Sequence, residues 1–198
     1  IISKIYISVS IVINLLCIKL LFKMVKSLIL VGYMGCGKST LGSLISEVNS
    51  LPFIDLDKYI ELKENTSIVK MFDDNGELFF RKKERFYLEQ IFMKPHPLII
   101  SLGGGTPCYF DNIDFLNLND QVLTIFLKTS PKELAKRLYK KKDNRPMISH
   151  LKSEQELHDY IAKHLYERLP YYLKAKKTII TDKKTIKSLV DEINLLLA

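Results

Sequence analysis

Short apolar runs alternate with longer stretches of helical periodicity along the chain after residue 24. The apolar runs have the length that is usual for a buried β-strand, four to eight residues. Each contains Val, Ile, Leu or Phe and is bounded by polar, Gly or Pro residues. They predict five strands, at residues 27–31, 51–57, 97–102, 121–128 and 178–181.

The segments between these runs have the spacing of amphipathic helices. In residues 77–92, for example, Phe80, Tyr87 and Ile91 recur at intervals that place them on one helix face. A further helix opens near residue 130. The other predicted helices lie at residues 41–48, 57–62, 66–72, 111–118, 153–169 and 185–197.

Polar residues with capping chemistry mark several helix starts. Thr66 and Ser130 are predicted N-caps, and Ser130 is followed by the proline that is typical of the first helical position. Residues 153–156 read Ser-Glu-Gln-Glu, which is a capping box. The sequence Asp-Asp-Asn-Gly at residues 73–76 predicts a turn, and the basic segment 140–153 predicts a loop.

The alternation of strands and helices predicts an α/β fold with a parallel, five-stranded sheet and helices on both faces. No repeat or low-complexity linker interrupts residues 24–198, so we expect a single domain there, with residues 1–23 outside it. Ligands of such sheets bind beyond the carboxyl ends of the strands. Polar or Gly-rich segments follow three of the predicted strands, at residues 32–39, 55–57 and 103–105, so we expect the site at this edge.

The segment after the first strand reads Gly-Tyr-Met-Gly-Cys-Gly-Lys-Ser-Thr, residues 32–40, and fits the P-loop pattern between a strand and a helix. Its glycines let backbone N–H groups turn toward one anion, and the next helix points its positive end there. Lys38 can then reach the β- and γ-phosphates, and the Ser39 hydroxyl can bind Mg²⁺. The pattern predicts a nucleoside triphosphate site without specifying the reaction.

Asp55 and Asp57 end the second predicted strand two positions apart, so on an extended chain they point to the same side. Beside a Mg²⁺–phosphate group, one carboxylate can hold the water shell of the metal. The other can orient or deprotonate a substrate hydroxyl. The structural alternative is a strand-end acid with a helix N-cap at Asp57, and the pattern leaves both interpretations open.

Arg81 and Glu84 lie three positions apart on one face of the predicted helix 77–92. A surface ion pair of small energetic weight is one interpretation. In the functional interpretation Arg81 binds a substrate carboxylate bidentately and Glu84 fixes its orientation.

Two loop segments have a structural and a functional interpretation. Gly103–Gly105 form either a flexible turn or a place where the backbone closely approaches a ligand. Arg145 lies in the basic segment 140–153 and is either a solvated loop residue or a lid arginine that closes on the transferred phosphoryl group.

Composition narrows the class of protein. Of the 198 residues, 47% are hydrophobic and 26% are charged, which indicates a globular rather than a disordered chain. The net charge of +8 suits anionic ligands, but no basic patch interleaved with aromatic residues favours nucleic acid. The three cysteines are scattered without a C-x-x-C pair, which argues against a disulfide framework or a zinc site and favours the cytoplasm.

Residues 1–23 differ from the rest of the chain, because residues 5–22 form an almost unbroken apolar run. This run is either a signal anchor or short transmembrane helix, or an upstream extension. We favour the extension, because the run is short for a membrane span and contains Lys19, and because Met24 stands where a compact P-loop domain would begin. We therefore expect a cytoplasmic monomer without stable membrane association.

Together, the motifs of residues 24–198 resemble the shikimate kinase family in order and spacing. The P-loop alone is generic, whereas the complete set is specific. The matching segments are residues 32–40, Asp55-Leu56-Asp57, Gly76-Glu77, Phe80-Arg81-Lys82-Lys83-Glu84, Leu102-Gly103-Gly104-Gly105, Arg145-Pro146 and Arg168-Leu169-Pro170-Tyr171-Tyr172.

The resemblance implies a P-loop kinase fold with a mobile lid. It also implies transfer of the γ-phosphate of ATP to the 3-hydroxyl of shikimate, which gives 3-phosphoshikimate and ADP on the route to chorismate and the aromatic amino acids. The implied catalytic residues are Lys38, Asp57 as the base, and Arg145 from the lid.

The resemblance also implies binding roles. Mg²⁺ would bind at Ser39, with Asp55 in its outer shell. Residues for ATP are Gly35, Cys36, Gly37, Lys38, Ser39, Thr40, Arg137, which looks like an adenine-stacking arginine, and Arg145. Residues for shikimate are Asp57, Arg81, Gly103, Gly104, Gly105 and Arg168.

Two alternatives stay open on the sequence. The first is a kinase for another small hydroxy acid such as gluconate, against which the Phe-Arg-x-x-Glu and triple-glycine motifs argue. The second is a non-catalytic nucleotide- or nucleic-acid-binding module, against which the presence of Lys38, Asp57 and Arg145 argues.

Overall fold

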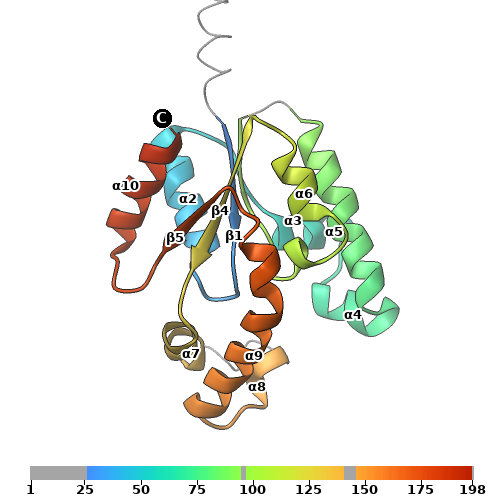
Figure 1. Ribbon diagram of the computed structural model, residues 1–198. Coiled ribbons are helices and arrows are strands. Elements are labelled where there is room, and N and C mark those ends of the chain that lie inside the picture. The colour runs from blue at the N-terminus through green and yellow to red at the C-terminus, as the bar shows by residue number, and fades with distance from the viewer. Residues whose placement is uncertain (1–25, 95–96, 141–145, 198) are drawn as a thin grey trace, which may run out of the picture.

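Figure 1 shows the computed structural model of the protein, which describes residues 26–94, 97–140 and 146–197. Five parallel strands form one sheet in the order β2-β3-β1-β4-β5, as the alternation of strands and helices predicts. The strands are β1 (Ser27–Val31), β2 (Phe53–Asp55), β3 (Ile99–Ser101), β4 (Val122–Lys128) and β5 (Lys177–Ile180).

Helices cover both faces of the sheet, which also confirms the prediction (Figure 1). α2 and α10 pack on one face, while α3, α5, α6 and α9 lie on the other, and α7 and α8 lie near the carboxyl ends of the strands. The helices are α2 (Lys38–Asn49), α3 (Leu56–Glu64), α4 (Ile68–Asn75), α5 (Glu77–Phe92), α6 (Asn112–Asn117), α7 (Pro131–Tyr139), α8 (Pro146–Ser149), α9 (Glu154–Tyr172) and α10 (Ile186–Leu197). A short 3₁₀ helix, η1 (Thr106–Cys108), follows β3.

The middle of the sheet is the core of the molecule. Every residue of β1 is buried, as are the first six residues of β4, because helices pack on both faces of these strands. The parallel register pairs Leu30 and Asp55 with Ser101 on either side. The carboxyl ends of β1, β2 and β3 therefore lie level with one another, where a site is expected.

The prediction that Asp55 and Asp57 share one extended strand is wrong. β2 ends at Asp55, whose side chain caps α3 by accepting the Lys58 N–H at 3.4 Å. Asp57 lies in the first turn of α3 and is not the N-cap. The helix begins this early because the Asp55 carboxylate satisfies a first-turn N–H and Leu56 is fully buried.

The boundaries of α4 also differ from the prediction. Ser67, not Thr66, is the N-cap, and its hydroxyl accepts the Lys70 N–H at 3.2 Å. The helix continues through Asn75, so the turn predicted at residues 73–76 is helical except for Gly76. Gly76 ends it with φ 78°, a conformation that glycine adopts without a Cβ clash.

Two predicted helix N-caps are confirmed, whereas one segment predicted as a loop is partly helical. Ser130 and Ser153 accept the N–H groups three residues later, at 3.3 Å and 3.0 Å. The segment predicted as a loop at residues 140–153 contains the short helix α8. α9 runs past Pro170 to Tyr172, three residues beyond the predicted end at 169.

Some predictions fall on residues outside those that the structure describes. These are the extension at residues 1–23 and Arg145 with most of the proposed lid, residues 141–145. Within residues 26–94, 97–140 and 146–197, no helix has the length and apolar character needed to cross a membrane.

Candidate active site

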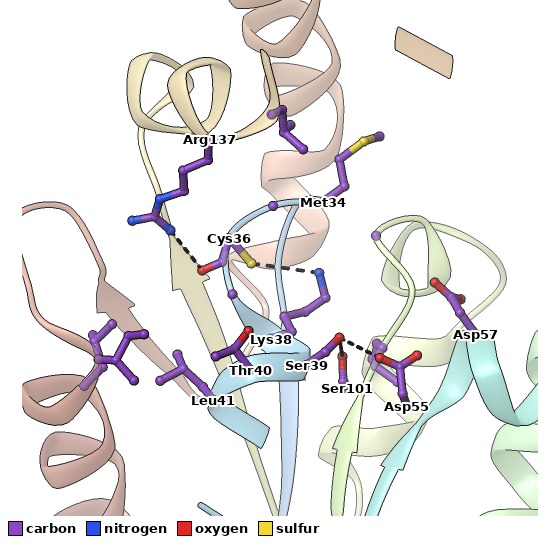
Figure 2. Close-up of a pocket in the computed structure, with 17 residues that line it drawn as sticks. Met34, Cys36, Lys38, Ser39, Thr40, Leu41, Asp55, Asp57, Ser101 and Arg137 are labelled. Carbon is purple, nitrogen blue, oxygen red and sulfur yellow. Dashed lines mark hydrogen bonds between the residues drawn. The ribbon is translucent and has the colours of Figure 1, made fainter. Parts of the chain in front are cut away.

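The P-loop wraps the carboxyl end of β1 and leads into α2 (Figure 2). Its glycines adopt positive φ angles, 81° at Gly35 and 105° at Gly37, and Gly37 is the N-cap of α2. No acidic residue lies in the first turn of α2. The N–H groups and the positive end of the helix dipole therefore meet no acidic side chain of α2 itself at a point suited to phosphate.

Lys38 is buried, and its ammonium group is held inside this loop. The Nζ atom donates to the Gly32 carbonyl at 2.7 Å and to the Tyr33 carbonyl at 3.1 Å, and it lies 3.9 Å from Cys36 Sγ. These contacts hold the positive charge beside the N–H groups of the loop, where it adds to the attraction for an anion.

Three oxygen-bearing side chains gather beside the loop, from α2, β2 and β3 (Figure 2). Ser39 Oγ donates to Asp55 Oδ2 at 2.6 Å and lies 3.5 Å from Ser101 Oγ. Mg²⁺ takes oxygen ligands and usually keeps several waters, so a hydroxyl with one nearby carboxylate fits its chemistry beside phosphate. The predicted pair Ser39 and Asp55 is thus suitably placed.

A pocket of about 600 Å³ opens over the P-loop and reaches Asp55, Asp57 and Ser101. Arg137 from α7 also lines it: Nη1 donates to the Cys36 carbonyl at 3.5 Å, and Nε pairs with Glu133 at 2.8 Å. Figure 2 shows Arg137 extending toward the loop from the side opposite Asp55.

A second pocket, of about 580 Å³, adjoins the first and shares Met34, Asp57 and Gly104 with it. It combines charged groups with an apolar side, as expected for a site that orients a small polar molecule. The charged groups are the guanidinium groups of Arg81 and Arg168 and the carboxylates of Asp57, Glu61, Asp73 and Glu84, and Gly103–Gly105 line the pocket beside them. The apolar side chains are Ile68, Val69, Phe72, Phe80 and Met147.

Arg81, in α5, is only 7% exposed, and carboxylates hold its guanidinium. Nη1 donates to Glu84 at 2.6 Å, and Nε and Nη2 donate to Glu77 at 3.2 Å and 2.9 Å. An arginine has five N–H donors. Toward the described residues three are engaged, which leaves one on each terminal nitrogen for a ligand carboxylate.

Glu84 is fully buried, lines the same pocket and pairs with Arg81. Burial raises the pKa of Glu84, while Arg81 and the hydrogen bond donated by Thr106 oppose that rise. A Cβ atom on Gly103 would approach Glu84 Oε1 to 2.9 Å and Asp57 Oδ1 to 2.6 Å. The glycine therefore allows the backbone after β3 to pack against both acids.

Asp57 stands where the two pockets meet, and its environment changes its acidity. Burial, followed by the nearby charges of Glu84 and Asp55, raises the pKa of Asp57 to about 6. Lys38 and Arg81 act in the opposite direction. A carboxylate with this pKa is ionised at pH 7 yet is a better proton acceptor than an ordinary aspartate.

Arg168 approaches the second pocket from α9. Its Cζ atom lies 5.6 Å from the centre of the Tyr33 ring, and Nη1 would lie 3.5 Å from a Cβ atom on Gly104. The second cation of the pocket is therefore packed between the P-loop and the triple glycine.

The structure thus brings the predicted residues that it describes into two adjoining pockets, and their roles stay predictions. The sequence analysis gave no role to several residues that line these pockets or contact the predicted site residues. Thr106 and Ser101 follow or end β3, but neither has a spacing that signals a site. The other such residues are Met34, which lines both pockets, and Glu77 and Tyr109, which contact Arg81.

A P-loop on a parallel sheet, next to a pocket for a small molecule that contains two arginines, defines the class of small-molecule P-loop kinases. A model of the shikimate kinase family, described as "Shikimate kinase", matches residues 34–197. The shikimate kinase of Flavobacterium psychrophilum is 42% identical over 172 residues, which are 87% of this chain and 99% of that protein. The chain therefore belongs to the shikimate kinase family.

Solved structures agree with this assignment. The crystal structure of shikimate kinase from Bacteroides thetaiotaomicron is 36% identical, with a TM-score of 0.79 over 87% of this chain and 98% of that chain. The Acinetobacter baumannii shikimate kinase in complex with shikimate is 31% identical, with a TM-score of 0.75 over 88% of this chain and 94% of that chain.

Proposed function

We propose that the protein transfers the γ-phosphate of ATP to the 3-hydroxyl of shikimate, giving 3-phosphoshikimate and ADP. The observation that carries this proposal is Asp57, a carboxylate that lines both the P-loop pocket and the second pocket. Membership of the shikimate kinase family and similarity to the Acinetobacter protein solved with shikimate support the choice of acceptor.

On the nucleotide side, the N–H groups from Gly35 to Thr40 and the ammonium group of Lys38 bind the phosphates. Ser39 and Asp55 would hold Mg²⁺, which neutralises charge on the phosphate oxygens when bound. Arg137 lies over the loop at Cys36 and is assigned to the adenine end of ATP. Arg145 is assigned to the lid, by the family motif alone.

On the acceptor side, Arg81 binds the shikimate carboxylate through its two remaining N–H groups. Arg168 and the backbone at Gly104 and Gly105 contact the ring substituents. The apolar side chains exclude water from the ring, which strengthens these polar contacts. This arrangement presents one hydroxyl to Asp57 and the phosphate loop.

Asp57 takes the proton of the attacking hydroxyl as the hydroxyl oxygen bonds to the γ-phosphorus, and the bond from that phosphorus to the β-phosphate oxygen breaks to release ADP. The raised pKa, about 6, suits this role because the carboxylate is ionised at pH 7.

An ADP-release assay with shikimate, quinate and gluconate as acceptors tests the proposal. Shikimate should give the highest kcat/KM, because the family match favours it and, unlike open-chain gluconate, it has a ring that can pack against the apolar side chains of the second pocket. A higher kcat/KM with gluconate would contradict the assignment and favour the other hydroxy-acid kinase.

We further propose that residues 24–198 carry the whole activity and that residues 1–23 are dispensable. The protein would then act as a monomer in the cytoplasm. Every described residue that lines the two pockets lies between Met34 and Leu189, which supports the placement of the activity in residues 24–198. A chain that begins at Met24 should turn over shikimate as fast as the full chain. Loss of activity in that shorter chain would assign residues 1–23 to the fold.

A further inference from the structure

The guanidinium of Arg81 is packed against an aromatic ring that no sequence motif pointed to. Arg81 Cζ lies 4.4 Å from the centre of the Tyr109 ring, which is closer than the rings of Phe80 and Phe72 at 5.3 Å and 5.8 Å. Gly105 packs against the same group, since a Cβ atom there would come within 2.7 Å of Cζ. Stacking of this kind restricts the plane of the guanidinium.

Tyr109 also holds the carboxylate that binds Arg81. Its hydroxyl donates to Glu77 Oε1 at 2.7 Å, and the same oxygen accepts from Arg81 Nε and Nη2. The Glu77 side chain is 48% exposed, so water competes for it. Tyr109 therefore reaches Arg81 twice, directly through its ring and indirectly through Glu77.

We infer that Tyr109 is a positioning residue for the acceptor carboxylate, which it serves by holding Arg81 and Glu77 in the geometry that binds this group. This inference rests on the proposed function, because it assumes that Arg81 binds the shikimate carboxylate. Arg81 lines the second pocket, which is the one proposed for the acceptor, and Tyr109 acts through Arg81.

The expected effect of Tyr109 is on binding rather than on the chemical step. An arginine that is already held in place loses less freedom when a carboxylate binds. The carboxylate lies away from the reacting hydroxyl, so this advantage is equal in the ground state and the transition state. Changes at Tyr109 should therefore raise KM for shikimate and leave kcat nearly unchanged.

A purely structural role for the Tyr109 hydroxyl is the competing explanation. The backbone around Tyr109 has its own hydrogen bonds, from Cys108 N–H to the Gly105 carbonyl at 2.8 Å and from Asn112 N–H to the Tyr109 carbonyl at 3.4 Å. Removal of one hydroxyl leaves these bonds intact. Tyr109→Phe should therefore fold, and its kinetics distinguish the two explanations.

The chain contains a matched control on the same helix as Arg81. Tyr87 donates its hydroxyl to Glu64 Oε1, and Lys83 donates to this same oxygen at 2.9 Å. This group repeats the arrangement of Tyr109, Glu77 and Arg81, but it lines neither described pocket. Tyr87→Phe therefore removes the same kind of hydrogen bond without touching the proposed site.

Steady-state kinetics of the full chain with ATP and shikimate test the inference. Tyr109→Phe should raise KM for shikimate by about threefold to tenfold, as expected for one lost hydrogen bond. Tyr109→Leu also loses the stacking and should raise it by more than about tenfold. For both variants, kcat and KM for ATP should stay within about twofold of wild type. The control Tyr87→Phe should keep the wild-type kcat, KM for ATP and KM for shikimate.

A double-mutant cycle with Glu77→Ala tests the indirect route. If the hydroxyl acts through Glu77, then Tyr109→Phe should change KM for shikimate by less than about twofold in the Glu77→Ala background. An equal rise in both backgrounds would refute this route. Wild-type KM for shikimate in Tyr109→Phe would refute the positioning role, as would an equal rise in Tyr87→Phe.

The same assay separates this inference from the proposed function. If wild-type protein does not phosphorylate shikimate, the proposed function fails and the inference fails with it. If wild-type protein phosphorylates shikimate but Tyr109→Phe keeps wild-type KM, only the inference fails.

Discussion

The two pockets are built in different ways. We call the pocket over the P-loop the nucleotide pocket and the second pocket the acceptor pocket, after the ligands proposed for them, and together they are the two halves of the site. In the nucleotide pocket, one continuous segment, residues 32–40, supplies the N–H groups, the lysine and the hydroxyl. Lys38 is held by carbonyl groups five and six residues earlier. The acceptor pocket instead combines side chains from α3, α4, α5, α8 and α9 with the segment after β3.

This difference determines what each pocket depends on. The nucleotide pocket depends on backbone conformation, which the glycines and the start of α2 impose locally. The acceptor pocket depends on packing, because Arg81 of α5 meets Gly105 and Tyr109 only when the segment after β3 lies against α5. Single substitutions should therefore separate the two halves in kinetic terms.

The largest effect is expected at Asp57, which belongs to both halves. Asp57→Asn keeps the size of the side chain but cannot take a proton, so kcat should fall by roughly 10²–10⁴-fold. ATP affinity, measured in parallel by titration calorimetry, should persist because Lys38 and the loop are unchanged. A near-normal kcat would leave Asp57 as a substrate-orienting residue without a role as base.

Arg81→Ala should affect the acceptor half alone. Loss of a charge-assisted pair of about 1.5–3 kcal/mol should raise KM for shikimate by about 10- to 150-fold, with ATP affinity unchanged. Some loss of kcat is expected too, since a looser substrate is less well aligned.

Arg85→Ala is the matched control for Arg81. Arg85 lies one turn later in α5, pairs with Glu89 and Asp111, and lies 4.3 Å over the Phe115 ring. Its removal should lower the unfolding temperature without changing KM for shikimate. Equal kinetic effects of the two substitutions would indicate that Arg81 acts only through the stability of α5.

The pH dependence follows from the environment of Asp57. Burial, with Glu84 and Asp55 next in importance, raises its pKa to about 6, so the ionised base is lost as pH falls below that value. In the pH profile, kcat/KM for shikimate should drop about tenfold per pH unit below 6. Asp57→Asn should lack this acidic limb, and an unchanged limb in that variant would assign it to another group.

The same raised pKa has a consequence for stability. The folded protein binds the Asp57 proton more tightly than the unfolded chain, so the stability from this group is fully present below about pH 4 and is lost as pH rises to about 6. At pH 7.5 Asp57→Asn should therefore raise the unfolding temperature. A lower unfolding temperature would show that the asparagine loses more in hydrogen bonding than it gains in desolvation.

The smallest effect is expected for Arg137, at the outer edge of the nucleotide half. It is about one-third exposed and makes a 3.5 Å hydrogen bond to the Cys36 carbonyl. Arg137→Gln should raise KM for ATP by about threefold to tenfold, in line with one exposed polar contact, and leave KM for shikimate unchanged. Lys136→Gln, in the same turn of α7, is the control, and the same rise in that variant would point to general charge rather than a specific contact.

Periodicity and local chemistry were enough to predict the parallel sheet, the P-loop and most helix starts. These features depend on neighbours in sequence: apolar runs for strands, glycines for the turn, and Ser130 and Ser153 for caps. The motif set was also enough to indicate the family. Such signals act over a few residues and are therefore visible in the chain itself.

Only the tertiary structure decided how the acceptor pocket is assembled. Asp57 lies in α3 and not in the predicted strand, because the Asp55 carboxylate caps the helix and Leu56 is buried. Thr106 and Tyr109 hold Glu84 and Arg81 from more than 20 residues away. The raised pKa of Asp57 arises from burial and from charges brought close by folding, which no local pattern of residues encodes.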